Sequence, residues 1–88
     1  MKVEFKASFA RDLKRTRDKG LLRQVQEVIE GAESVRTVLD ISNVKKLRVE
    51  GRYYRVKLGN YRIGLILEGD TVTFVRFLHR REIYRHFP

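Results

Sequence analysis

The chain has 88 residues and a formal net charge of +9, from 20 Lys or Arg against 11 Asp or Glu. It has no cysteine, which excludes disulfides, thiol catalysis and cysteine-based metal sites. No apolar run reaches membrane-spanning length and the start lacks the apolar stretch of a signal peptide, so we expect a single domain over residues 1–88, located in the cytoplasm and not in a membrane.

The first part of the chain predicts a strand and a pair of helices. Residues 2–6 alternate between polar and apolar side chains, as in a half-buried strand. Ser8 is placed to cap a helix over residues 9–18, and Gly20 is expected to end it in the left-handed conformation. A second helix is expected over residues 21–33. The apolar stripes of the two helices are Phe9, Ala10 and Leu13, and then Leu21, Leu22, Val25, Val28, Ile29 and Ala32.

Three strands are expected in the second half, at about residues 53–58, 61–68 and 71–78. Gly-Asn and Gly-Asp pairs separate them and are typical of two-residue hairpin turns. The third strand does not alternate cleanly, which indicates either a β-bulge or cover on both faces. The preceding stretch, residues 35–49, predicts no regular element.

Residues 79–88 are expected to form a short helical tail beside the turn at Gly59-Asn60. The order of elements predicts an α+β fold: an N-terminal strand, an antiparallel helical hairpin, a three-stranded antiparallel meander and a C-terminal helical tail. The helices should cover one face of the sheet and leave the other face open.

The first hairpin of the meander separates basic from apolar side chains. Lys57 should lie opposite Arg62 on the open face, with Arg55 opposite Gly64. Like charges facing each other destabilise a sheet, so this crowding favours a bound polyanion over an ordinary solvated strand face. Gly64 is expected to clear space beside Arg55 as the floor of a groove. On the covered face the expected pairs are Leu58 with Tyr61, Val56 with Ile63 and Tyr54 with Leu65.

The charge is concentrated in the second half. Residues 1–44 carry nine basic and seven acidic residues, whereas residues 45–88 carry eleven and four. A basic half interleaved with tyrosines is typical of a nucleic-acid binder. An acidic protein partner fits the same charge, while an anionic membrane fits less well because this half alternates like a sheet.

The chemistry open to these residues is metal-free. The two histidines have no carboxylate cluster beside them, and neither a Ser-His-Asp motif nor a glycine-rich phosphate loop is present. We therefore expect no metal and no cofactor. RNA carries its own nucleophile, the 2′-hydroxyl, so an enzyme needs a base such as Lys57 and cations for the phosphate. Tyr84 either stacks on a base or packs as an ordinary aromatic side chain.

Two segments carry a family resemblance. The run Tyr54-Arg55-Val56-Lys57-Leu58-Gly59-Asn60-Tyr61-Arg62-Ile63, preceded by Lys46-Leu47, and the ending His79-Arg80-Arg81-Glu82-Ile83-Tyr84 resemble the RelE/ParE superfamily of toxins. These toxins belong to bacterial and archaeal toxin–antitoxin pairs. Length and element order are also similar, so the resemblance spans nearly the whole chain.

The resemblance to the RelE branch implies a metal-independent endoribonuclease that cleaves mRNA in the ribosomal A site and inhibits translation. By position, Lys57 matches the general base, Arg62 the phosphate-binding arginine, Arg80 the residue that protonates or stabilises the leaving group, and Tyr84 the stacking tyrosine. The implied partners are a cognate antitoxin and the ribosome with bound mRNA. The residues implied to bind substrate are Arg55, Arg81, His79 and Lys46.

A second branch of the same superfamily implies a different activity. ParE-like toxins inhibit DNA gyrase, and they often keep the Tyr-Arg and His-Arg elements. Arg55 and Lys57 together favour the RelE branch, because RNA cleavage needs these cations and gyrase binding does not obviously need them there. An inactive or purely RNA-binding relative is the remaining alternative.

Overall fold

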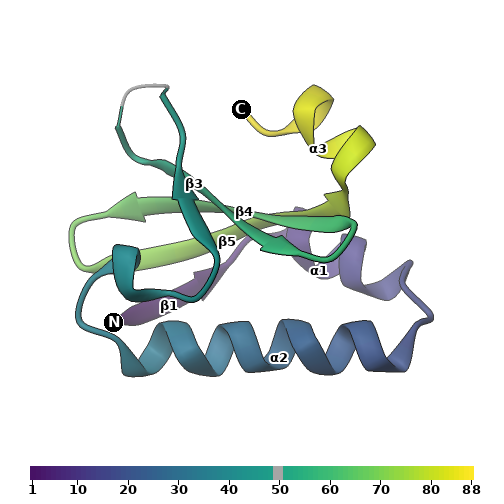
Figure 1. Ribbon diagram of the computed structural model, residues 1–88, viewed down its shortest axis with the longest axis horizontal. Helices are drawn as coiled ribbons and strands as arrows, with labels where there is room; N and C mark the ends of the chain where they lie inside the picture. The colour runs from purple at the N-terminus through teal and green to yellow at the C-terminus, as the bar shows by residue number, and fades with distance from the viewer. Residues whose placement is uncertain (49–50) are drawn as a thin grey trace.

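The computed structural model describes residues 1–48 and 51–88 and has an α+β fold built on one mixed sheet (Figure 1). The strand order is β1-β5-β4-β3-β2, with β1 parallel to β5 and the other pairs antiparallel. In chain order the elements are β1 (Lys2–Phe5), α1 (Ala7–Lys14), α2 (Lys19–Ser34), the 3-10 helix η1 (Val38–Asp40), β2 (Val44–Lys46), β3 (Tyr53–Leu58), β4 (Tyr61–Glu68), β5 (Thr71–His79) and α3 (Arg80–His86).

The meander β3–β4–β5 confirms the predicted register. Lys57 pairs with Arg62, and Arg55 pairs with Gly64. Gly59 and Gly69, in the two turns, have φ values of 60° and 62°, a conformation that glycine adopts without steric penalty. The predicted irregularity in the third strand is a β-bulge, because the register shifts beside Gly64 and leaves Val75 without a partner in β4.

Both predicted helices are present, but α1 packs against β5 and α2 against β1, and the ends of the helices differ from the prediction. Ser8 does not cap α1; it lies inside the helix, and its hydroxyl donates to the backbone carbonyl of Val75 in β5. Gly20 does not end α1 either, because it lies in the first turn of α2. Asp18 begins α2 instead, since its carboxylate accepts a hydrogen bond from the Leu21 amide at 3.0 Å.

One position of the first apolar stripe was also assigned to the wrong side. Ala10 is exposed, and Asp12 is buried in the same helix. Asp12 faces β5 because its carboxylate accepts hydrogen bonds from Arg76 and from the Phe77 amide. A charged residue is therefore buried at a position where an apolar residue was expected.

Residues 35–48 hold two elements that the sequence did not predict. The short helix η1 and the strand β2 lead into the meander, and β2 pairs with β3 with Val44 opposite Val56. Asn43, just before β2, has φ of 63° and turns the chain into the strand. Val49, the last residue of the stretch without a predicted element, lies outside the described residues.

The main core lies between α2 and one face of the sheet. In Figure 1, α2 runs beneath the strands and α3 lies on the opposite side. The side chains that are buried in this core come from both helices and the sheet, as alternation along each strand requires. They include Phe9, Val25, Ala32, Val56, Ile63, Leu65, Val72, Phe74 and Phe77.

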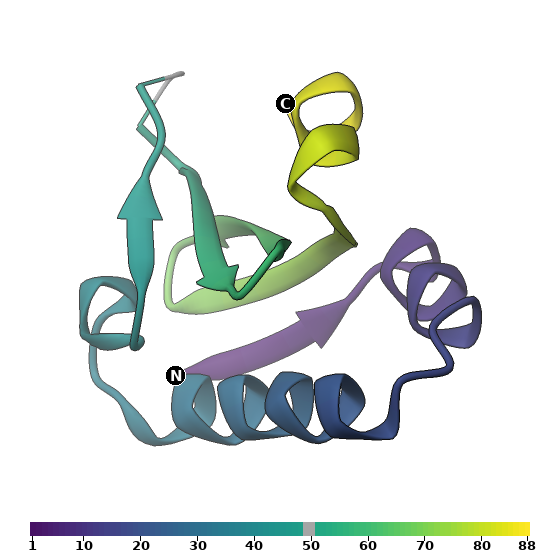
Figure 2. The same cartoon turned by 45° about the vertical axis from the view of Figure 1, so that its right-hand side comes forward.

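The second face of the sheet is only partly open, which corrects the prediction. Helix α3 packs over β4 and β5 on this side (Figure 2). Ile83 is fully buried and Phe87 is 5% exposed. The basic residues of β3 and β4 therefore lie beside a helix and not on a bare sheet.

β1 pairs with only the first part of β5, and α1 covers the same edge of β5 further along the strand. The Asp12 carboxylate accepts hydrogen bonds from the Phe77 amide at 2.9 Å and from the Arg76 guanidinium at 2.8 and 3.1 Å. Ser8 donates to the neighbouring Val75 carbonyl. Backbone groups that would otherwise form a free sheet edge thus bond to helix side chains.

No helix in the described part of the chain combines the length and apolar character that crossing a membrane requires.

Candidate nucleic-acid interface

Two rows of side chains cross the partly open face of the sheet. One row places Lys57 opposite Arg62, and the Lys57 amide donates to the Asn43 carbonyl at 3.0 Å, which adds residue 43 at its end. The second row places Lys45 opposite Arg55, with Gly64 beyond. Because neighbouring strands are about 4.8 Å apart, the cations of each row are adjacent.

The row that contains Arg55 lies under α3. The guanidinium carbon of Arg55 lies 4.6 Å from the centre of the Tyr84 ring, a cation–π contact. Tyr84 is nevertheless 65% exposed. The helix therefore brings an accessible aromatic ring to the edge of the basic rows, as the stacking of a nucleobase would require.

These residues surround a pocket of about 340 Å³, which we call the cation pocket. Its lining includes four basic side chains and, among the described residues, no carboxylate. Such a lining suits a polyanion such as a nucleic-acid backbone. The lining residues are Asn43, Val44, Lys45, Arg55, Lys57, Arg62 and Tyr84.

Arg62 is held in place by the turn that precedes it. Its guanidinium donates to the carbonyls of Gly59 at 2.9 Å and of Tyr61 at 2.8 Å, and the side chain is half-buried. A cation that is already fixed loses less conformational entropy when it binds a phosphate. Lys57, by contrast, is exposed.

The other predicted site residues do not line the cation pocket in the described part of the chain. Lys46 pairs with the buried Tyr54, so strand alternation places it on the opposite face of the sheet. Arg80 and Arg81 are exposed at the start of α3. The Arg80 amide donates to the Asn60 carbonyl at 2.8 Å, which joins α3 to the β3–β4 turn.

His79 is the residue that directly precedes α3. Its Nδ1 accepts a hydrogen bond from the Arg81 amide at 3.2 Å, and its ring meets that of Tyr61 edge-on at 5.5 Å. It lines a different hollow, between α1 and β5, together with Asp12 and Arg15. The imidazole therefore caps the helix that carries Tyr84.

Gly64 does not form an open groove floor. A Cβ atom at this position would come within 2.6–2.8 Å of carbons in the ring of Phe87. Tyr53 meets the same ring edge-on at 5.9 Å. Because Gly64 has no side chain, the ring of Phe87 at the end of α3 can pack against the sheet here. The cation pocket lies next to this contact.

Three residues that line the pocket, Asn43, Val44 and Lys45, were not predicted from the sequence. All three belong to the unpredicted strand β2 or directly precede it. A prediction of β2 with Lys45 opposite Arg55 would have placed Lys45, and not Lys46, on the face of the cation pocket.

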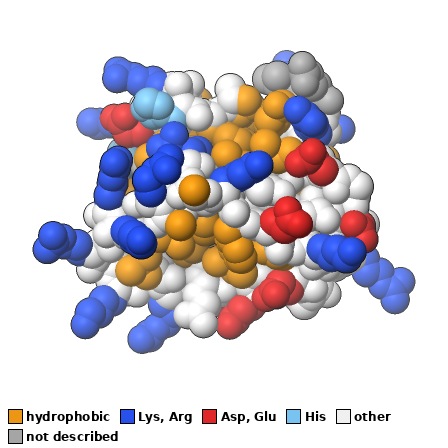
Figure 3. Space-filling view, turned by 180° about the vertical axis from the view of Figure 1, so that it is seen from behind, with side chains coloured by type: hydrophobic (Ala, Val, Ile, Leu, Met, Phe, Trp, Pro, Cys, Tyr) orange, Lys and Arg blue, Asp and Glu red, His pale blue; other side chains and the backbone are white. Residues whose placement is uncertain are grey.

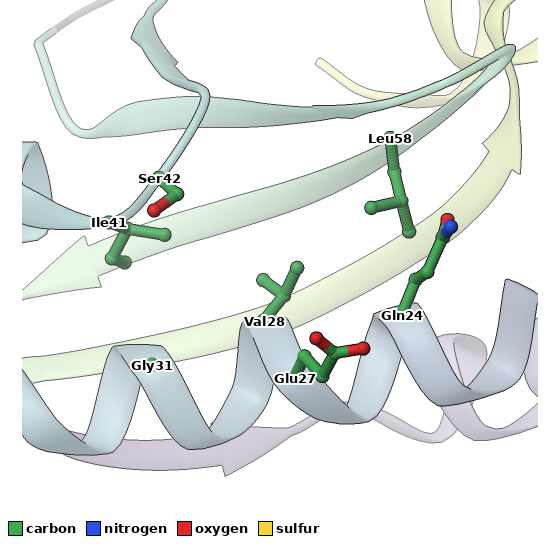
Figure 4. Close-up of a pocket in the computed structure, with 7 residues that line it drawn as sticks. All are labelled: Gln24, Glu27, Val28, Gly31, Ile41, Ser42 and Leu58. Atoms are coloured by element: carbon green, nitrogen blue, oxygen red, sulfur yellow. The ribbon is translucent and has the colours of Figure 1, made fainter.

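A second pocket, of about 320 Å³, lies between α2, the segment that precedes β2 and the end of β3 (Figure 4). Val28, Ile41 and Leu58 contribute apolar surface, and Glu27 contributes a carboxylate. This lining does not suit a polyanion. The cation pocket is therefore the better candidate for a nucleic-acid interface.

Basic residues are not confined to that pocket. The back of the molecule has Lys and Arg around much of its rim, with apolar surface between them (Figure 3). Charge alone therefore does not single out a candidate interface. The cation pocket differs from the other basic surface in combining paired cations with an exposed aromatic ring. Among the described residues, no group of three or more His, Asp or Glu is arranged to hold a metal ion.

Comparison with known proteins gives consistent matches over nearly the whole chain. The model for the ParE toxin of the type II toxin–antitoxin system parDE matches residues 3–84. Toxin RelE3 of Methanocaldococcus jannaschii is 38% identical over 89 residues, which cover 100% of both proteins.

Solved structures agree with these matches. A chain of the RelB–RelE antitoxin–toxin complex from Methanococcus jannaschii superposes with a TM-score of 0.81 and 35% identity, covering 97% of this chain and 99% of that one. A chain of the archaeal RelE–RelB complex from Pyrococcus horikoshii OT3 has the same fold, with a TM-score of 0.73, 20% identity and coverage of 90% and 93%.

Proposed function

Because this chain belongs to the RelE/ParE superfamily of type II toxin–antitoxin toxins, we propose that it is an endoribonuclease that cuts mRNA in the ribosomal A site and stops translation. The observation that supports this proposal is the cation pocket, in which Lys57 and Arg62 lie opposite each other beside Arg55 and Tyr84. A gyrase inhibitor has no evident need for such a pocket.

The proposed reaction uses the RNA as its own nucleophile. Lys57, as the free amine, takes the proton of the 2′-hydroxyl, and the 2′-oxygen attacks the adjacent phosphorus. Arg62 and Arg55 stabilise the charge that develops on the phosphate oxygens. The bond from phosphorus to the 5′-oxygen breaks, which leaves a 2′,3′-cyclic phosphate and a 5′-hydroxyl end.

The leaving 5′-oxygen needs a proton and a stabilising charge. We assign the charge to Arg80, which lies at the start of α3, next to the Gly59-Asn60 turn, and is exposed. A guanidinium is a poor proton donor, so the proton comes from the protonated Lys57 or from water. Tyr84 stacks on a nucleobase and orients the phosphodiester.

We also propose that cleavage needs no metal ion. A pocket with four basic side chains neutralises a crowded phosphate without a cation from solution, and it repels a divalent ion. The remaining predicted substrate contacts, Arg81, His79 and Lys46, lie outside the pocket. Arg81 and Lys46 are exposed and can approach distant phosphates of a bound ribosome, whereas His79 serves the helix cap.

We further propose a cognate antitoxin as partner, in a cytoplasm that also holds the ribosomes. The solved relatives from Methanococcus jannaschii and Pyrococcus horikoshii are complexes of RelE with RelB. A toxin with a net charge of +9 is complementary to an acidic antitoxin segment.

Inhibition of DNA gyrase is the second candidate, because the matching family model is described as a ParE toxin. One experiment separates the two activities. The protein is expressed without an antitoxin, and incorporation of labelled amino acids is compared with that of thymidine. We expect amino-acid incorporation to fall first, with new mRNA ends on programmed ribosomes in vitro. Early loss of thymidine incorporation, intact mRNA and inhibition of supercoiling would support gyrase instead.

A further inference from the structure

Asn43 occupies a position in the cation pocket that phosphate binding does not explain. Its backbone carbonyl bonds to the Lys57 amide, so it stands at the end of the row formed by Lys57 and Arg62. It lines the pocket and is exposed. Within the described part of the chain, its carboxamide makes no hydrogen bond.

Backbone geometry permits either glycine or asparagine at this position, because asparagine tolerates the left-handed conformation better than most other residues. Asn43 has φ of 63°, and the other described residues with positive φ are all glycines, at positions 51, 59 and 69. Glycine adopts this conformation more easily than asparagine does. The side chain is therefore the feature that distinguishes position 43 from the other turns.

None of the roles assigned above to the other pocket residues includes recognition of the identity of a nucleobase. Lys45, Arg55, Lys57 and Arg62 suit phosphates, which carry no sequence information. Tyr84 offers a ring on which any base can stack. A carboxamide presents a donor and an acceptor side by side, which match the N6 amino group and N7 of adenine.

We propose that Asn43 selects the nucleobase of the bound RNA, with adenine preferred, by pairing with its edge. This inference rests on RNA being the ligand of the cation pocket, as the proposed function has it. It does not require that the RNA be cleaved, so binding and cleavage can be tested separately.

The test measures binding of fluorescent tetraribonucleotides in low salt, with all four base identities in turn. Their 2′-hydroxyls are methylated so that no cleavage can occur. Wild-type protein should bind the adenine oligomer about tenfold more tightly than the uracil oligomer, as expected for one bidentate contact. Asn43→Gly should keep the backbone conformation and reduce this ratio to about one.

Asn43→Asp is the sharper variant, because it keeps the shape and removes the donors. A carboxylate accepts from the N4 amino group of cytosine, so the preference should move from adenine to cytosine while overall affinity falls. Lys45→Ala is the matched control: it should weaken all four oligomers by a similar factor. Thermal unfolding of each variant checks that the fold is intact.

Equal binding of all four oligomers by wild type, or an adenine preference that persists in Asn43→Gly, would overturn the assignment. A guanine preference would do the same, since it would point to Lys45 or Arg55 as the reader. Adenine-selective binding without cleavage on ribosomes would support the role of Asn43 and contradict the nuclease proposal. No binding of any oligomer would overturn the role of Asn43 as a reader of RNA bases in the cation pocket, whereas the nuclease proposal is decided by the cleavage assay on programmed ribosomes.

Discussion

The ring of Phe87 lies on Gly64, in the space that a side chain at position 64 would occupy. The nearest ring carbon is 2.6 Å from the position of a Cβ atom at residue 64. This contact fixes one end of α3 on the sheet, and the hydrogen bond from the Arg80 amide to Asn60 fixes the other. Tyr84, between them, owes its position over Arg55 to both attachments.

Gly64→Ala should therefore damage the site without touching a residue that lines it. The added methyl group forces Phe87 outward, at a cost of about 1–3 kcal/mol in the free energy of unfolding. Cleavage should fall as Tyr84 shifts. Chemical denaturation and single-turnover assays measure the two effects.

A double-mutant cycle tests the mechanism of that loss. In a Phe87→Ala background, Gly64→Ala should add little further destabilisation, because the ring that it clashes with is gone. Gly31→Ala is the control substitution, since a Cβ atom there meets nothing within 4 Å. It should raise stability by about 0.5–1 kcal/mol, as expected in a helix interior. Undiminished destabilisation in the Phe87→Ala background would contradict the clash.

Lys57→Arg separates charge from proton transfer at the proposed base. Arginine keeps the positive charge in the row with Arg62 but cannot lose its proton near neutral pH. The rate of single-turnover cleavage at saturating ribosome should fall by about a hundred- to ten-thousand-fold, with affinity nearly unchanged. A variant that cleaves at the wild-type rate would show that Lys57 supplies charge only.

Arg62→Ala should weaken RNA binding in a way that depends on salt. The loss of one phosphate contact lowers the slope of log affinity against log salt by about 0.7 for a single strand. Fluorescence anisotropy over a salt titration measures this slope. Arg23→Ala, an exposed change on α2 away from the pocket, serves as the control and should leave the slope nearly unchanged. An equal slope for Arg62→Ala and wild type would exclude a phosphate contact at Arg62.

Asp12→Ala should be the most destabilising change outside the apolar core. It removes the acceptor for the Phe77 amide and the partner of Arg76, whose side chain is 23% exposed against 2% for Asp12. Because Arg76 can reach water, we expect a loss of about 2–3 kcal/mol, less than for a fully buried pair. Denaturant unfolding measures it. Glu33→Ala, on the exposed surface of α2, should change stability by less than about 0.5 kcal/mol.

Local patterns were enough to predict the meander and the main helix. Alternation of side chains and the Gly59 and Gly69 turns depend on neighbouring residues, so the register of β3 and β4 followed directly. The entry of α1, the short strand β2 and the packing of α3 depend on contacts far along the chain. Ser8 and Asp12, for example, take their positions from β5, more than sixty residues away.

In the candidate site, too, residues positioned by local patterns could be predicted and residues positioned by distant contacts could not. Lys57, Arg62 and Arg55 could be placed together because they belong to one hairpin. Lys46 was named from the family resemblance alone, and no strand was predicted around it. The structure places Lys45 opposite Arg55 and Lys46 opposite Tyr54, so the two lysines lie on different faces of the sheet. The role of His79 as a helix cap was missed because it depends on where α3 begins.

The bond between Asp12 and Arg76 joins residues that are 64 positions apart. Contacts of such separation form late in folding, because the entropy of closing a long loop must first be overcome. The meander, whose strands are joined by two-residue turns, can assemble earlier. If the junction between Asp12 and β5 forms after the transition state, Asp12→Ala should accelerate unfolding and leave the folding rate nearly unchanged.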